Sequence, residues 1–314
     1  MTPPTPVTPP TPVTPAKDPR RRPRVVALGG GHGLATTLQA ARLYAGELTA
    51  VVSVADDGGS SGRLRQIAGI PAPGDLRRCL VAMAGADADS TWARAFEYRF
   101  PSGDLEGHAL GNLLIAGLAN VTGNFGEALQ LASSLLGTVG RVLPATATPV
   151  VLKADVAGTE VLGQVNVSES PGTISGVSIV PPDAPVPAEV LAAIAGADQI
   201  VIGPGSLFTS VLAVCVVPGI RDALEARRQA NAGARSIVYV CNLRPQPPET
   251  AGFTPADHLR AVLGHGVPVD AMITHDPAAP EQLDGIRVVR APVNRPDGAG
   301  HAPARLAAVL RRLT

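Results

Sequence analysis

The chain has 314 residues, in which 26 Lys and Arg balance 26 Asp and Glu, and only 3% of its residues are aromatic. A neutral chain lacks the broad basic surface that binds a phosphate backbone, and few aromatic side chains remain to stack on bases, so we expect no nucleic-acid partner. Charged residues make up 17% of the chain, below the usual ~25%, and the mean hydropathy is +0.20. This composition predicts a large buried core and association into a homo-oligomer.

Cysteine spacing and hydropathy indicate a cytoplasmic protein. The cysteines are Cys79, Cys215 and Cys241, an odd number too widely spaced for a C-x-x-C pair, which argues against a disulfide framework. The longest apolar stretch, residues 211–217, is far shorter than the ~18 residues that indicate a membrane span. The N-terminus has no apolar signal core either. We therefore expect no membrane span.

Residues 1–22 form a separate Thr/Pro-rich segment. Threonine stands at every third position from Thr2 to Thr14, and proline fills most of the gaps. Polyproline II has three residues per turn, so these threonines would line one edge of an extended rod. Such a composition cannot bury enough apolar surface to fold, which predicts a disordered tail, with a phosphorylatable or docking tail as the alternative. Residues 23–314 would then form one domain.

From Arg24 onward, short apolar runs alternate with helical periods. The runs have the continuity of strands buried on both faces of a parallel sheet, and they cover residues 24–28, 50–54, 199–202, 236–240 and 271–273. Two helices are clearly marked: one begins at Thr254 with a capping-box-like Asp257, and the last carries an apolar stripe from Leu306 to Leu313. The pattern predicts an α/β fold with a Rossmann-like, doubly wound, mostly parallel sheet.

Residues 140–182 break this alternation. Three β-favouring runs, residues 150–156, 160–167 and 173–180, follow one another across glycine-containing turns with no helical period between them. Consecutive strands of this kind pair as an antiparallel meander. We therefore predict a small β-rich insertion at about 140–182 within the doubly wound domain.

Glycines follow the first predicted strand. In an open parallel sheet, ligands bind at the carboxyl ends of the strands, where helix N-termini present free N–H groups. Here the strand runs into a glycine-rich turn and then a helix, expected near Leu34, which together make a phosphate cradle. The turn is not the dinucleotide fingerprint, because Leu34 stands at the third glycine position, and it is not a P-loop. A turn without a ligand is the alternative. The candidate residues are Gly30, Gly31, His32 and Gly33.

The second predicted strand ends in a pair of carboxylates. Adjacent acidic side chains repel each other unless they bind a Mg²⁺ ion, a ribose hydroxyl or a sugar hydroxyl. The glycines and serines that follow favour an anion nest. The run also matches G-x-S-x-G, but Ser60 lies too far beyond the strand for a nucleophile elbow, so a hydrolase is only a minor alternative. The candidates are Asp56, Asp57, Gly58, Gly59 and Ser60.

Other candidates lie further along the chain. Asp75 follows a Pro-Gly turn and is expected to be a helix N-cap. His108 and Asn112 are four residues apart, opposite an apolar stripe, so they share a face that contacts either a ligand or solvent. The later strand ends supply Gly203, Pro204, Gly205, Ser206 and Asn242. Several such motifs at one edge of a sheet favour a nucleotide or nucleotide-sugar site.

The motifs together resemble the gluconeogenesis factor family, the YvcK-like branch of the superfamily that includes 2-phospholactate transferase. The order and spacing of the resemblance run from about Arg24 to the C-terminus, leaving the Thr/Pro-rich segment outside. The matching runs are GGGHGL at 29–34, ADDGGSSGR at 55–63, PGDLR at 73–77, GHALGN at 107–112, GRVLP at 140–144 and VIGPGS at 201–206.

This resemblance implies a Rossmann-like core, a cytoplasmic location and the binding of UDP-sugars, notably UDP-N-acetylglucosamine. It also implies a role in cell shape and cell-wall synthesis during growth on gluconeogenic carbon sources, without an established reaction. The transferase relatives join a phospholactyl group to a deazaflavin, use Mg²⁺, and have an active-site aspartate at the position of Asp56 or Asp57. Three positions depart from the family pattern: His32 replaces Thr, Pro248 replaces Gly, and Gly300 replaces Arg.

We rank a non-catalytic regulator that binds a UDP-sugar and acts on protein partners above a Mg²⁺-dependent transferase. Nine aromatic residues in all make it difficult to line an acceptor pocket for a flavin-like ring. The sequence specifies no resident metal or cofactor, and Mg²⁺ is expected only if the protein is a transferase. NAD or NADP ranks lowest, because the fingerprint glycine is missing.

Overall fold

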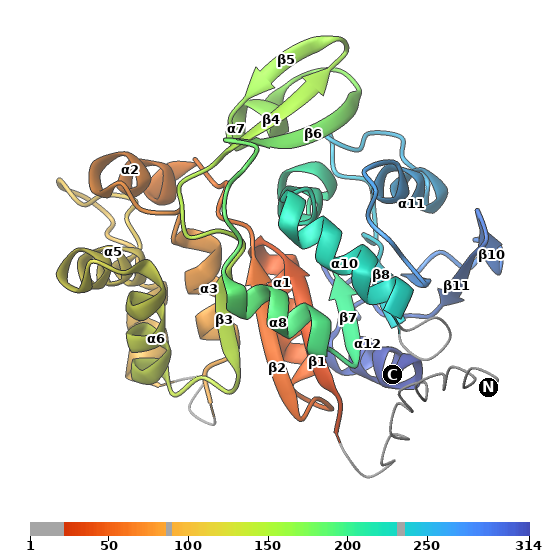
Figure 1. Cartoon of the computed structure of the whole chain (residues 1–314), viewed down its shortest axis with the longest axis horizontal. Coiled ribbons are helices and arrows are strands. Elements are labelled where there is room, and N and C mark those ends of the chain that lie inside the picture. The colour runs from red at the N-terminus through yellow and green to blue at the C-terminus, as the bar shows by residue number, and fades with distance from the viewer. Residues whose placement is uncertain (1–21, 86–89, 231–235) are drawn as a thin grey trace, which may run out of the picture.

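The protein is built on one large sheet. The structure, a computed structural model, describes residues 22–85, 90–230 and 236–314, so the Thr/Pro-rich residues 1–21 lie outside the described part. Eight strands form the sheet in the order β10-β11-β9-β8-β7-β1-β2-β3 (Figure 1), and β10 alone is antiparallel to its neighbour. The strands are β1 Arg24–Gly29, β2 Glu47–Val52, β3 Arg141–Pro144, β7 Gln199–Ile202, β8 Ser236–Val240, β9 Ala271–Thr274, β10 Gln282–Leu283 and β11 Ile286–Arg290. The predicted doubly wound, mostly parallel sheet is confirmed.

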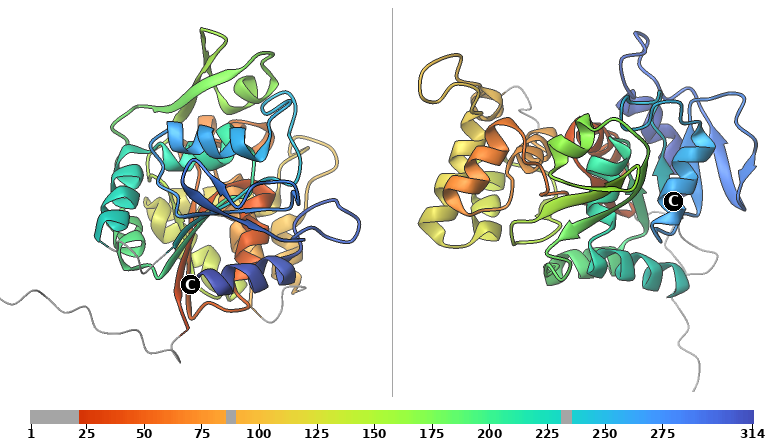
Figure 2. Two further views of the ribbon diagram at one scale, coloured as in Figure 1. Left: turned by 90° about the vertical axis from the view of Figure 1, so that its right-hand side faces the viewer. Right: turned by 90° about the horizontal axis from the view of Figure 1, so that it is seen from above.

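Helices cover both faces of this sheet (Figures 1 and 2). α1 packs with α3 and α12 on one face, and α8 packs with α10 on the other. The helices are α1 Gly31–Ala41, α2 Gly59–Ala68, α3 Gly74–Ala82, α4 Thr91–Glu97, α5 Leu110–Thr122, α6 Phe125–Leu136, α7 Gln164–Glu169, α8 Ala188–Gly196, α9 Ala213–Cys215, α10 Pro218–Ala230, α11 Pro255–Gly264 and α12 Pro303–Leu310, with the π-helix η1 Leu207–Leu212 and the 3-10 turn η2 Arg311–Leu313.

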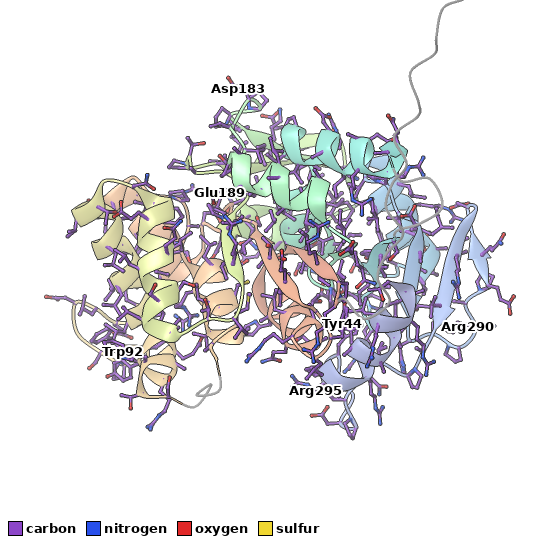
Figure 3. All side chains as sticks on the ribbon, turned by 60° about the horizontal axis from the view of Figure 1, so that its bottom comes forward. Tyr44, Trp92, Asp183, Glu189, Arg290 and Arg295 are labelled. Carbon is purple, nitrogen blue, oxygen red and sulfur yellow. The ribbon has the colours of Figure 1, made fainter. Side chains whose placement is uncertain are left out.

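The core lies between the sheet and these two helical layers, where side chains fill the space (Figure 3). β7 is buried at all four positions, as its continuous apolar run predicts for a central parallel strand. Its one polar residue, Gln199, accepts a hydrogen bond from the hydroxyl of buried Tyr44 at 2.5 Å and donates one to the Leu310 carbonyl at 2.9 Å. The capping box at Thr254 and Asp257 is also confirmed.

The insertion is a three-stranded antiparallel sheet with one helix. β4 Val151–Val156 lies between β5 Thr159–Leu162 and β6 Ile174–Val180, so the strands do not follow the meander order. Residues 164–169 form α7, and the expectation of a strand over 160–167 is therefore wrong in its second half. Residues 141–144 belong to β3 of the main sheet. In Figure 1 the insertion lies at the top, beyond the carboxyl end of β2.

Within the described ranges, no single helix is both long and apolar enough to cross a membrane. One bent helix pair, Leu207–Cys215 with Pro218–Ala230 at 71°, meets the length and composition criteria.

Candidate functional site

The carboxyl ends of β1 and β7 meet where the strand order reverses. From β1 the chain passes through α1 to β2 on one side, whereas from β7 it passes through η1 and α10 to β8 on the other. Ligands of open α/β sheets bind in the crevice at such a switch point. The glycine turns that follow β1 and β7 therefore lie at the position where this fold favours a ligand.

The two turns are packed directly against each other. The Gly203 N–H donates to the Leu28 carbonyl at 3.0 Å, and the Thr37 hydroxyl donates to the Gly203 carbonyl at 2.7 Å. A β-carbon at Gly33 would collide with the carbonyl of Pro204. Glycine at position 33 is thus required by close backbone approach.

Helix α1 begins at Gly31, three residues earlier than expected, and leaves donors free. No acidic residue lies in its first turn, and Gly30 provides no side-chain cap. Among the described residues, none accepts a hydrogen bond from the N–H groups of Gly30, His32 or Gly33. His32 is exposed in this first turn. Free amides at a helix N-terminus carry partial positive charge and favour an anion.

The two aspartates after β2 have different partners. Asp57 accepts the backbone N–H groups of Gln164 and Val165, each at 3.0 Å, and so caps α7. Asp56 accepts only the Gly58 N–H, at 3.0 Å through Oδ1; no described residue donates to its Oδ2. The sequence left both aspartates open as ligand contacts, and the structure leaves Asp56 as the one with a free oxygen. Gly59 begins α2.

Asp75 lies inside the first turn of α3 and is not its N-cap, so that expectation is wrong; Pro73 precedes the helix. Its buried carboxylate binds Arg78 at 2.7 Å and accepts the Gly31 N–H, which places it beside the start of α1. Burial raises the pKa of Asp75, Arg78 opposes this rise, and the charge of Asp56 adds to it. Asp56 and Asp75 are therefore interacting carboxylates.

Ser60, His108 and Asn112 form one buried cluster. Ser60 Oγ lies 3.0 Å from His108 Nδ1 and 3.1 Å from Asn112 Nδ2. His108 and Asn112 are 6% and 2% exposed, which rules out the solvated-face alternative. Sequence reasoning placed these three residues in the site without showing that they contact one another.

Hydrogen bonds within the protein hold the turn after β7. Asn242 accepts the Gly205 N–H at 3.1 Å and donates to the Gly205 carbonyl at 2.8 Å. Ser206 precedes η1 but its side chain makes no capping hydrogen bond. The cap comes from Glu249, which accepts the N–H groups of Phe208 at 2.5 Å and Thr209 at 3.1 Å. The N–H groups of Gly205, Phe208 and Thr209 thus have acceptors within the protein, and this second glycine turn stays a predicted ligand contact.

Sequence reasoning missed Glu249. Burial raises the pKa of Glu249, and the hydrogen bonds from Phe208 and Thr209 act in the opposite direction. The run at 246–250 drew attention only for Pro248. A carboxylate that caps a helix about 40 positions earlier in the chain has no local signature.

A divalent cation fits beside α1 only together with a ligand. Within the described residues, no group of three or more His, Cys, Asp or Glu is arranged to hold a metal. Asp75 supplies a carboxylate next to the free amides of α1, and Asp56 supplies a second one whose charge interacts with it. Mg²⁺ is commonly held by one or two carboxylates together with substrate phosphates and water. The residues present thus suit a cation that arrives with a phosphorylated ligand.

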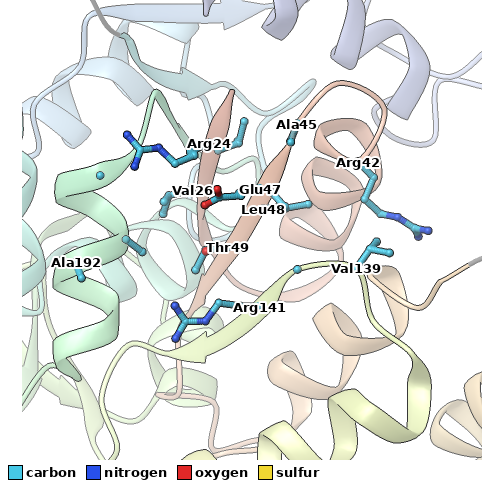
Figure 4. A pocket seen from close by; sticks show the side chains of 15 residues that line it. Arg24, Val26, Arg42, Ala45, Glu47, Leu48, Thr49, Val139, Arg141 and Ala192 are labelled. Carbon is cyan, nitrogen blue, oxygen red and sulfur yellow. The ribbon is translucent and has the colours of Figure 1, made fainter. Parts of the chain in front are cut away.

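A cavity of about 620 Å³ lies elsewhere, at the amino ends of β1, β2 and β3 (Figure 4). Its arginines have partners already: Arg24 lies 3.6 Å from Asp198, Arg141 2.8 Å from Glu189, and Arg42 donates to the Ala82 carbonyl. Gly140 and Arg141 of the GRVLP run line this cavity, but the sequence analysis placed no candidate site residue in it. It is remote from the switch point, because the amino and carboxyl ends of parallel strands lie at opposite edges of a sheet.

Comparisons with known proteins agree with this architecture. A family model described as 2-phospho-L-lactate transferase CofD matches residues 25–293. A protein named "Putative gluconeogenesis factor" from Mycobacterium tuberculosis is 40% identical over 309 residues, covering 91% of this chain and 89% of its own length. The "Gluconeogenesis factor" of Halalkalibacterium halodurans is 41% identical over 262 residues, covering 82% and 79%.

A solved structure shows the same fold. The crystal structure of a UPF0052 family member from Bacillus halodurans has a TM-score of 0.85 and 36% identity, over 93% of this chain and 99% of that one. These matches confirm the resemblance that the glycine and aspartate motifs predict. The chain belongs to the CofD family, on the branch of the gluconeogenesis factors.

Proposed function

We propose that the chain binds a nucleotide sugar at the carboxyl ends of β1, β2 and β7, with UDP-N-acetylglucosamine as the first candidate. One observation carries the proposal: the free amides of α1 lie at the switch point beside Asp75, whose carboxylate interacts with the charge of Asp56. Helix-terminal amides bind phosphate, and carboxylates accept hydroxyl groups or hold a phosphate-bound cation. A diphosphate that carries a sugar presents both kinds of group.

The bound nucleotide sugar would act as a signal rather than a substrate. Asp57 caps α7, and Ser60 and Asn112 hydrogen-bond within the protein. These three polar side chains therefore stabilise the fold and are not free to take part in a reaction. The relatives are named gluconeogenesis factors, which supports a role in gluconeogenic growth. In this proposal the protein works in the cytoplasm through protein partners and supports cell shape and cell-wall synthesis.

A Mg²⁺-dependent transferase is the second candidate, favoured by the family description and by the Asp56–Asp75 pair. When bound, Mg²⁺ would neutralise phosphate charge at this pair. The candidate also requires an acceptor pocket for a flavin-like ring. Tyr98 packs edge to face on Phe100, and Phe208 packs edge to face on Phe253. Because these rings pack on one another, they do not favour such a pocket.

The test is a thermal-shift panel of UDP-sugars, GDP, NAD and NADP, each with and without Mg²⁺. A ligand that binds only the folded state raises its Tm, and we expect the largest rise with UDP-N-acetylglucosamine. Asp56→Asn should reduce this rise, whereas Asp183→Asn, in the exposed loop after β6 (Figure 3), should not. A strong NADP shift without a UDP-sugar shift overturns the proposal.

A further inference from the structure

We infer that Arg77, Asn112 and Ser60 hold His108 as a neutral imidazole with its proton on Nε2. His108 then offers a hydrogen-bond donor that takes a phosphoryl or carbonyl oxygen of a ligand. The ligand half of this inference rests on the proposed function, whereas the protonation half rests on the protein alone. It also makes Ser60 and Asn112 positioning residues instead of ligand contacts.

The chain of contacts begins at Arg77 of α3, which is 1% exposed. Its guanidinium donates from Nη1 to the Phe96 carbonyl at 3.2 Å and pairs with Glu97 at 2.5 Å. Its Nε donates to Asn112 Oδ1 at 3.1 Å. Arginine has donors only, so the atom of Asn112 that faces it must be the oxygen. This contact fixes the orientation of the Asn112 amide.

The amide nitrogen of Asn112 therefore faces Ser60. Nδ2 donates to Ser60 Oγ at 3.1 Å, and Ser60 has one other side-chain partner among the described residues, His108 Nδ1 at 3.0 Å. The buried Ser60 hydroxyl needs an acceptor for its own proton, since a buried donor left unpaired destabilises the folded protein. The Ser60 proton must point to His108 Nδ1, which therefore carries no proton of its own.

A neutral imidazole with a bare Nδ1 carries its proton on Nε2. The charged form would need a proton on Nδ1 as well, and that proton would displace the Ser60 hydroxyl from its acceptor. Burial lowers the pKa of His108, and the neighbouring positive charge of Arg63 lowers it further. The surroundings and the hydrogen bonds thus favour the same neutral state.

The Nε2 side of the ring is the side open to a ligand. No described residue accepts a hydrogen bond from His108 Nε2. Because a fully buried Nε2 would then be a buried polar atom without a partner, and it is not one, this nitrogen reaches solvent. Ser60, which holds the opposite side of the ring, lies in the first turn of α2, directly after the Asp56 loop. An N–H donor at this place donates to an oxygen lone pair of a ligand and disfavours a ligand N–H group.

The experiment uses the full chain labelled with ¹⁵N, whose imidazole nitrogens are observed by long-range proton–nitrogen NMR at pH 7.5. The His108 signals are identified as those missing from His108→Gln. We expect a bare Nδ1 and a protonated Nε2. Observation of a proton on Nδ1, alone or in the charged ring, overturns the inference.

Two variants test the positioning chain. In Asn112→Asp the new carboxylate can only accept, so the Ser60 hydroxyl should turn to it and His108 should move its proton to Nδ1. The matched control is Asn120→Asp on the exposed side of α5, whose amide donates only to the Ala116 carbonyl; it should leave the signals unchanged. Should Asn112→Asp not fold, Ser60→Ala replaces it and should give mixed tautomers. An unchanged Nε2 proton in these variants contradicts the proposed series of hydrogen bonds from Arg77 to His108.

The ligand half is read from the same spectra. UDP-N-acetylglucosamine, and separately inorganic diphosphate, should move the His108 Nε2 resonance, and His108→Phe should weaken binding of the nucleotide sugar about tenfold or more, consistent with loss of a ligand hydrogen bond. A thermal shift by these probes with an unmoved Nε2 resonance overturns the donor role. If neither probe binds, the proposed function and the donor role fail together, while the protonation state stands on its own spectrum.

Discussion

The carboxylate of Asp57 accepts the N–H of Val165, 108 positions further along the chain, at 3.0 Å. The second carboxylate oxygen accepts the N–H of Gln164 at the same distance. One side chain at the end of β2 thereby caps α7 and attaches the insertion to the rim of the main sheet. The position of the insertion depends on the loop that also carries Asp56.

Asp57→Ala should loosen α7. Loss of a side-chain N-cap costs about 0.5–2 kcal/mol, and we expect the cost to appear as faster amide hydrogen exchange over residues 164–169. Asp57→Asn keeps one acceptor oxygen and should preserve most of the protection. Equal exchange rates in wild type and Asp57→Ala would show that the cap does not hold the insertion.

Gly33→Ala should destabilise the whole domain. The added methyl group would meet the Pro204 carbonyl, and overpacking of this kind costs about 1–3 kcal/mol. Gly117 of α5 provides the control, since a β-carbon there meets no atom within 4 Å, and Gly117→Ala should stabilise by about 0.5–1 kcal/mol through helix propensity. Urea unfolding measures both values, and equal stabilities would mean that the two turns are not packed as described.

Two buried histidines should make the fold sensitive to acid. Burial lowers the pKa of His258 and of His301 from 6.5 to about 4. The folded protein then binds fewer protons than the unfolded chain between these values, so the stabilisation is complete above pH 6.5 and is lost as the pH falls towards 4. The loss is about 3 kcal/mol per histidine.

Urea unfolding at a series of pH values measures this loss. His258→Gln and His301→Gln should each reduce the slope of stability against pH between pH 6.5 and 4. The double variant should flatten the curve further. A slope that is the same in wild type and in both variants would assign the acid sensitivity to other groups.

The low charge content predicts self-association, which can be tested on α5. This helix contains no charged residue, yet Leu114 and Leu118 are partly exposed and Val121 is 86% exposed. Exposed apolar side chains gathered on one helix are typical of a surface that contacts another protein. We expect light scattering to give a mass above the 31.9 kDa of one chain and Val121→Glu to lower it. Ile67→Glu on α2, at a site 79% exposed, is the control. A monomeric wild type contradicts the prediction.

Local sequence was sufficient for the framework of the fold. β7 and β8 begin and end at the residues that their apolar runs predict, and the capping box of α11 forms as its sequence indicates. A helix was also expected after the glycine turn that follows β1, although it begins at Gly31 and not near Leu34. These features depend on neighbours within a few positions, because backbone freedom, capping and burial of a central strand are set by adjacent side chains.

Only the tertiary structure decided how the polar groups are used. Asp56 and Asp57 are adjacent and chemically identical, but one keeps a free oxygen and the other caps a helix from the insertion. Glu249 was overlooked, although it caps η1. A carboxylate takes the donors that the fold brings to it, and here those donors come from residues 40 to 108 positions away. Sequence spacing therefore located the candidate residues at the carboxyl ends of the strands, whereas long-range hydrogen bonds determined the role of each residue there.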